Sequence, residues 1–306
     1  LSLKAVDPTR YGSLSHPGDS FSYDIFSQAA QAVRNPVGLD PLQGLEVKRM
    51  IAVGESQSAG RLATYFNAIH PTVELFDGFI IHSRGGGSSP LSQAPQAEIP
   101  TPSPTFERTD LPEPVIGLQT ESDLFLLNSI TMRQPDTGNY RLWEVAGSAH
   151  SDVYTTFKGP DDKGDDPTVA DVIERPEAQE PFIVCDTPVN DGPGPWVAKA
   201  SLAALDTWIR TGVPAPSAPR LDVNAQGTAF VFDDLGNVTG GIRTPYVDAP
   251  VAILSGEGQP DVEDGNFLQR FCRLFGTTEL FDDARMFDLY PTEQVYIDEI
   301  DAATDS

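Results

Sequence analysis

The sequence predicts an α/β fold in which a mostly parallel sheet is flanked by helices. Short apolar runs alternate along the chain with amphipathic helical stretches, the pattern of parallel strands joined by crossover helices. The 27 prolines and 26 glycines indicate long, stiffened loops between these elements. A chain of 306 residues can bury a large core, either as one large domain or as a domain with an extension.

The charge and hydropathy of the chain narrow the classes of partner. Its formal net charge of −25 at pH 7 argues against a nucleic-acid or anionic-membrane surface, because phosphate contacts need Lys and Arg. No run of about 18 apolar residues occurs, so we expect no membrane-spanning helix. The first residues carry neither an initiator Met nor a signal-peptide hydrophobic region, so we expect a removed segment or a longer product. The compartment stays open.

The first elements in chain order are a helix, a strand and a second helix. Residues 23–34 are predicted to form a helix that ends before a proline. Residues 50–53 are a short apolar run, typical of a buried parallel strand. From Ser58 onward, apolar residues recur at spacings of three and four, which predicts a helix. A strand, a tight turn and a helix therefore meet at residues 54–58.

The turn at residues 54–58, with the sequence GESQS, resembles the nucleophile elbow of the α/β-hydrolase superfamily, where a strained serine projects over the sheet. Small residues two positions to either side, here Gly54 and Ser58, let the strand and helix approach each other. The superfamily has glycine where this chain has Ser58. By this resemblance Ser56 is the candidate nucleophile, and the N–H of Gln57 at the helix N-terminus is the candidate oxyanion donor.

Three further strands are predicted after this helix, at residues 75–82, 114–119 and 140–146. Residues 84–112, after the first of them, are rich in Gly, Ser and Pro and show almost no apolar periodicity. Irregular segments of this length are usually functional lids or disordered links. Because the superfamily often carries its cap at the corresponding position, the resemblance implies a lid-like loop here.

Acidic residues and a histidine follow the last two of these strands. Glu121 and Asp123 come directly after residues 114–119, and His150 comes after residues 140–146. The order serine, acid, histidine is that of the α/β-hydrolase superfamily. Asp123 stands three residues past Thr120, where many members have the acid of a Gly-x-x-Asp turn, so Asp123 is favoured and Glu121 is the alternative.

The other candidate ligands and thiols have simpler interpretations. His70 at a helix end and His82 at a strand end are better explained as structural residues. The acidic run at residues 161–166 is interpreted as a solvated loop, because its glycine is misplaced for a calcium-binding loop. We therefore expect no metal and no cofactor. Cys185 and Cys272 could form one disulfide or be two buried thiols, and buried thiols are favoured.

The chain divides into two predicted parts. Residues 1–215 are expected to form a hydrolase-type domain that ends in an amphipathic helix, and residues 216–306 a β-rich extension packed on it. Only about one helix precedes the elbow, although the superfamily places several strands and an oxyanion-donating loop there. We therefore expect the C-terminal half of the fold, with the second oxyanion donor in a separate or missing N-terminal portion.

Four stretches are similar to a bacterial family of alpha/beta hydrolase domain-containing proteins: GESQSAGRLATYFNAIHP, AGSAHSDVY, PVNDGP and GGIRTPYVDAP. The resemblance extends from about Leu3 to the C-terminus. It implies a serine hydrolase that cleaves a small-molecule carboxylic ester or lactone through Ser56, His150 and Asp123 or Glu121. The alternatives are an acyltransferase or lyase on the same residues, or an inactive binding or scaffold module. Substrate identity and oligomeric state stay open.

Overall fold

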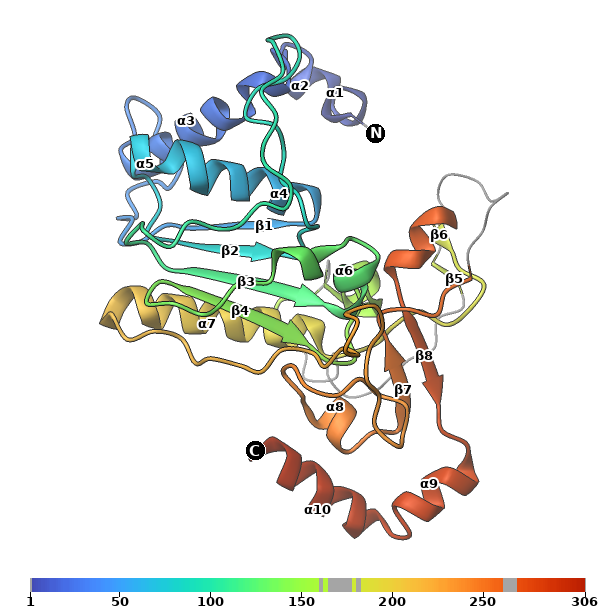
Figure 1. The fold of residues 1–306 in the computed structure, drawn as a ribbon. Coiled ribbons are helices and arrows are strands. Elements are labelled where there is room, and N and C mark those ends of the chain that lie inside the picture. Colours follow the sequence, from blue (N-terminus) through green and yellow to red (C-terminus); the bar gives the residue numbers. More distant parts are fainter. Residues whose placement is uncertain (1, 160–161, 165–177, 180–182, 261–268, 306) are drawn as a thin grey trace.

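The centre of the structure is a four-stranded parallel sheet in the order β1-β2-β3-β4 (Figure 1). A computed structural model describes residues 2–159, 162–164, 178–179, 183–260 and 269–305. All of β3 and most of β2 are buried, which explains their largely apolar sequences. Because the four strands run the same way, their carboxyl ends meet along one edge of the sheet. The strands are β1 (Ile51–Glu55), β2 (Gly78–His82), β3 (Val115–Thr120) and β4 (Tyr140–Val145).

Helices cover both faces of this sheet (Figure 1). Helices α3 (Ser22–Arg34) and α4 (Gln57–Thr64) lie on one face, and α7 (Gly194–Thr211) lies on the other. Successive residues of β2 enter opposite layers: Phe79 packs in the core cluster with α3 and α4, and Ile80 packs in the cluster with α7. The fold is thus the α/β arrangement that the sequence predicts.

Helix α4 continues into a π-helical turn at Tyr65–Ile69. None of the helices in the described part of the chain is long and apolar enough to cross a membrane.

The remaining helices and strands are short or lie at the periphery of the sheet. The other labelled elements are α1 (Leu3–Val6), α2 (Pro8–Tyr11), α5 (His70–Val73), α6 (Glu121–Phe125), β5 (Ala178–Gln179), β6 (Ile183–Val184), α8 (Pro245–Asp248), β7 (Ala252–Ser255), β8 (Thr277–Leu280), α9 (Asp283–Leu289) and α10 (Glu293–Thr304).

Element boundaries differ from the sequence prediction by a few residues at several ends, and two of the differences bear on the packing around the site. The strand expected over residues 75–82 pairs only from Gly78; Leu75 and Phe76 are buried as their apolar character predicts, but they pack ahead of the strand. The elbow helix begins at Gln57 rather than Ser58, because the chain turns into the helix directly after Ser56. Both differences concern ends of elements, where local patterns are least decisive.

The segment at residues 84–112, for which the sequence predicts a lid-like loop, is anchored to the helices beside the sheet, and its role as a lid stays a prediction. Its base is fixed by a fully buried ion pair in which Arg84 Nη2 lies 2.7 Å from Glu107 Oε1. Farther along, the Pro90 carbonyl oxygen accepts a hydrogen bond of 2.8 Å from the Tyr23 hydroxyl of α3. The segment thus runs along α4 towards α3 (Figure 1). Among the described residues, none of this segment lines the cavity beside His150.

Residues 216–306 share a core with the sheet domain. Ile242 donates its N–H to the carbonyl of Glu144 over 2.7 Å and accepts the N–H of Ala146 over 3.1 Å, which continues the pairing beyond β4. Residues before and after 215 therefore pack against each other. Their shared apolar cluster includes Leu124, Ala146, Leu221, Phe230, Val238 and Val247. The division of the chain into two domains at residue 215 stays a prediction.

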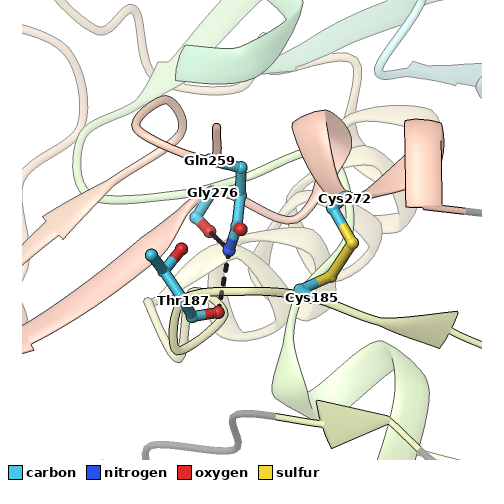
Figure 2. Close-up of a disulfide and its surroundings, with 5 residues drawn as sticks. All are labelled: Cys185, Thr187, Gln259, Cys272 and Gly276. Atoms are coloured by element: carbon cyan, nitrogen blue, oxygen red, sulfur yellow. Dashed lines mark hydrogen bonds between the residues drawn. A yellow bond between two sulfur atoms is a disulfide. The ribbon is translucent and has the colours of Figure 1, made fainter. Parts of the chain in front are cut away.

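Cys185 and Cys272 form a disulfide, so the favoured interpretation of buried thiols was wrong (Figure 2). Both residues are buried, as expected for cysteine, but the fold brings their Cα atoms to 5.5 Å. Near the bridge, Gln259 donates hydrogen bonds to the carbonyl oxygens of Thr187, at 3.1 Å, and Gly276, at 2.7 Å (Figure 2). The C-terminal strand region is therefore joined covalently to the segment that leads into α7.

Replacing both Cys185 and Cys272 by Ala is expected to lower the free energy of unfolding by about 2 to 4 kcal/mol. The bridge joins positions 87 residues apart, so its loss frees a long loop in the unfolded chain. Urea unfolding of the variant and the oxidised wild type measures the difference. A reducing agent should destabilise the wild type and leave the double variant unchanged; equal midpoints for oxidised wild type and variant would contradict the prediction.

Candidate active site

Ser56 occupies a strained turn between β1 and α4. Its backbone has φ 56° and ψ −121°, a region that side-chain-bearing residues rarely adopt. A Cβ atom at Gly54 would come within 2.8 Å of the Ser58 carbonyl oxygen, so glycine is needed for the close approach of strand and helix. The Ser56 N–H is also held by the His82 carbonyl at 3.0 Å. These constraints fix the direction in which the Ser56 side chain points.

Three side chains predicted from the sequence meet in one hydrogen-bonded chain. His150 Nε2 lies 2.9 Å from Ser56 Oγ, and His150 Nδ1 lies 2.7 Å from Asp123 Oδ1. His150 is only 7% exposed and Asp123 is fully buried. The Nδ1 contact to a carboxylate favours the tautomer with its proton on Nδ1, which leaves Nε2 as an acceptor for the Ser56 hydroxyl.

Asp123 is fixed by its own strand end. Its Oδ2 atom accepts the Thr120 N–H at 2.7 Å and the Thr120 hydroxyl at 2.8 Å, within a capping box at the start of α6. Oδ1 is thereby left for His150. The structure brings Asp123 to the histidine and does not bring Glu121 there.

Glu121 instead braces the loops around the site. Its Oε1 accepts the Gly147 N–H at 2.6 Å, and its Oε2 accepts the Gly256 N–H at 2.8 Å. Complete burial raises the pKa of Glu121 to about 8, although both N–H groups and the Arg243 charge act in the opposite direction. Glu121 therefore joins the loop after β4, and the segment after β7, to the turn that carries Asp123.

A second brace, not apparent from the sequence, holds His150 itself. The Ser122 hydroxyl accepts the backbone N–H of His150 at 3.1 Å and donates to the Gly256 carbonyl at 2.6 Å. A Cβ atom on Gly256 would lie 2.4 Å from the Ser122 nitrogen, so only glycine fits there. The C-terminal region thus helps to hold His150 in place. Contacts between segments this far apart in the chain leave no local sequence pattern beyond a glycine and a serine.

The environment of His150 favours its protonated form. Burial alone would lower the pKa of His150, but the hydrogen bond to Asp123 and the negative charges of Asp123 and Glu55 outweigh burial and raise it. An imidazole with a raised pKa is a stronger acceptor for the proton of Ser56.

A cavity of about 400 Å³ lies beside His150. Burial raises the pKa of Asp152 to about 6, despite the two hydrogen bonds that its Oδ1 accepts from Thr155. Burial lowers the pKa of His82, against the opposing charges of Glu55 and Asp123. His82, interpreted from the sequence as purely structural, therefore borders the site. The cavity is lined by Glu55, His82, Thr120, Ala149, His150, Asp152, Tyr154, Thr155, Gly159, Gly194, Pro195, Ala198, Lys199 and Leu202.

Gln57 places its backbone N–H beside the elbow. It is the first residue of α4, so this N–H has no carbonyl partner within the helix. The helix dipole adds partial positive charge at the same point. A free N–H at a helix N-terminus is the kind of group that stabilises a developing negative charge, and the oxyanion role of Gln57 stays a prediction.

The remaining predicted residues lie away from this chain of hydrogen bonds. His70 is buried between Phe66 and Phe79 with its Nε2 3.3 Å from a Glu113 carboxylate oxygen. Within the described ranges, no group of three His, Cys, Asp or Glu side chains could hold a metal ion. Of the acidic run at residues 161–166, only 162–164 are described, and the rest lies outside the described residues.

The variant Glu121→Gln is expected to change how stability depends on pH. A carboxyl whose pKa rises from 4.5 to about 8 on folding adds stability that is complete below pH 4.5 and is lost as pH rises to about 8. Glutamine cannot ionise, so the variant should become more stable relative to the wild type between about pH 5 and about pH 8. Urea unfolding at both pH values measures this, and a constant difference would contradict it.

Comparison with known proteins agrees with this architecture. A family model described as "Alpha/beta hydrolase domain" matches residues 1–306. No curated protein and no solved structure matches the chain. The matched superfamily indicates a hydrolase-type activity. The elbow between β1 and α4, the parallel sheet and the matched family model together lead to one conclusion: the chain belongs to the alpha/beta hydrolase domain family.

Proposed function

We propose that the protein is a serine hydrolase that cleaves a carboxylic ester or lactone through a covalent acyl-enzyme on Ser56. The observation that carries this proposal is the continuous contact from Ser56 Oγ to His150 and from His150 to Asp123, at 2.9 Å and 2.7 Å. An ordinary loop serine after a parallel strand needs neither a positive φ nor a buried imidazole–carboxylate pair behind it.

In the first half-reaction, His150 Nε2 takes the proton of the Ser56 hydroxyl while Oγ attacks the carbonyl carbon of the ester. The carbonyl π electrons move to oxygen, and the Gln57 N–H stabilises the resulting oxyanion. The buried Asp123 carboxylate keeps the imidazole oriented and stabilises its positive charge. The tetrahedral intermediate then collapses, and His150 gives its proton to the departing alkoxide oxygen. The products of this half-reaction are an alcohol and the Ser56 ester.

In the second half-reaction, His150 removes a proton from water, and the hydroxide oxygen attacks the acyl carbon. The second tetrahedral intermediate collapses with return of the proton to Ser56 Oγ, which releases the carboxylic acid. A lactone follows the same steps, except that the alcohol and acid remain parts of one molecule. An alcohol in place of water would make the same residues an acyltransferase, and a product that depends on added alcohol would reveal it.

The variants Ser56→Ala and Asp123→Asn are expected to lower kcat/KM for a p-nitrophenyl ester by roughly 10³-fold or more. The first removes the nucleophile, and the second removes the charge that holds the His150 tautomer. Stopped-flow or steady-state release of p-nitrophenol measures both. Ser13→Ala, an exposed serine remote from the elbow, serves as the matched control and should leave kcat/KM unchanged. A Ser56→Ala variant with wild-type turnover would refute the proposal.

A further inference from the structure

Glu55 stands at the carboxyl end of β1, directly before Ser56. In the parallel pairing of β1 with β2, it lies opposite His82, and both residues line the cavity that also contains His150. Cross-strand partners project to the same face of a sheet. Glu55 and His82 therefore lie at the carboxyl ends of β1 and β2 and face the same cavity as His150. Asp123 contacts His150 from α6 instead.

The Glu55 carboxylate has no structural role that accounts for its position. Among the described residues it accepts no hydrogen bond and forms no ion pair, and its side chain is exposed to solvent. The buried carboxylates of the fold are different: Glu107 pairs with Arg84, Glu144 pairs with Arg133, and Glu121 accepts two backbone N–H groups. The Glu55 charge is therefore not neutralised by a partner among the described residues, and it acts on the groups that share the cavity with it, His82 and His150.

We propose that Glu55 is a positioning residue whose carboxylate, facing the cavity beside His150, stabilises the positive charge that His150 takes up when it accepts the Ser56 proton. This role rests on the proposed serine hydrolase function. The proton itself moves only between Ser56, His150 and the leaving group or water; the role of Glu55 is electrostatic.

The other charged groups around His150 do not cancel this effect. Burial lowers the pKa of His82, so its ring is neutral at pH 7 and leaves the Glu55 charge uncompensated. Lys199 has its ammonium 3.0 Å from an Asp162 carboxylate oxygen, which neutralises it locally. The titratable and charged groups around His150 are Asp123 on α6, Glu55 on β1, His82 on β2, Asp152 and Tyr154 on the following segment, and Lys199 on α7.

The ring of His82, which lies opposite Glu55 in the pairing of β1 with β2, is partly open to solvent. In the described structure its ring nitrogens have no hydrogen-bond partner, yet they are not sealed from solvent, unlike both ring nitrogens of buried His70. A neutral, open imidazole next to Glu55 keeps this part of the cavity polar. The Glu55 charge thus acts across the partly solvated cavity that Glu55, His82 and His150 line, where water screens its field but does not abolish it.

The test is a histidine titration by NMR in Glu55→Gln and in Glu98→Gln, an exposed carboxylate on residues 84–112 that serves as the matched control. The chain has only four histidines, so His150→Asn identifies the relevant signal. Glu55→Gln should lower the pKa of His150 by about 0.5 to 1 unit and shift His82 in the same direction, because a nearby negative charge is lost. Glu98→Gln should shift neither. An unmoved His150 in Glu55→Gln would overturn the proposal.

The pH dependence of kcat/KM distinguishes an electrostatic effect of Glu55 on His150 from a structural effect of the substitution. In Glu55→Gln, the acidic limb of kcat/KM for a neutral p-nitrophenyl ester should move to lower pH by the same amount, with KM little changed. If Ser56→Ala retains full turnover, the proposed hydrolase function fails, while the NMR result still decides whether Glu55 acts on His150. A shifted titration with an unmoved kinetic limb would overturn the catalytic part of the proposal.

Discussion

The backbone of Ser56 is the constraint on which the site depends. A positive φ at a serine is unfavourable, and it persists because its neighbours leave the chain no alternative. Gly54 permits the close contact with α4, and the His82 carbonyl holds the Ser56 N–H. The same turn presents the hydroxyl to His150 and makes Gln57 the first residue of α4, whose N–H has no partner within the helix. The same short turn therefore ends β1, begins α4 and positions the candidate nucleophile.

The C-terminal region also stabilises the site, through hydrogen bonds of Gly256. Its N–H and carbonyl are bound by Glu121 and Ser122, and Ser122 in turn accepts the His150 N–H. Since Glu121 and Ser122 directly precede Asp123 in sequence, one glycine from beyond β7 stabilises both the turn that carries Asp123 and the loop that carries His150. The disulfide acts in the same area, because the Ser151 N–H is bound by the carbonyl of Leu274, two residues after Cys272. The hydrolase-type site is thus held from both parts of the chain.

The sequence predicts the parts of the site that depend on local patterns. The elbow is recognised from an apolar run, a turn of small residues and a helical spacing of apolar residues. Asp123 and His150 are recognised because each follows the end of a predicted strand. Interactions between distant segments leave no such mark. Glu121 bonds to a backbone 135 residues away, so its brace could not be distinguished in advance from the role of a catalytic acid. The cysteine pairing and the position of residues 84–112 against α3 and α4 depend equally on the completed fold.

The central claim is that Ser56 is activated by His150, and a fluorophosphonate probe tests it most directly. The Oγ of a serine that a neighbouring base makes nucleophilic attacks the phosphorus of such a probe and displaces fluoride, while the base takes the hydroxyl proton. If His150 activates Ser56, the wild type should carry one adduct per chain, located on Ser56 by peptide mass spectrometry, and the His150→Asn variant should carry none. A folded wild-type protein with no adduct on Ser56 would contradict it.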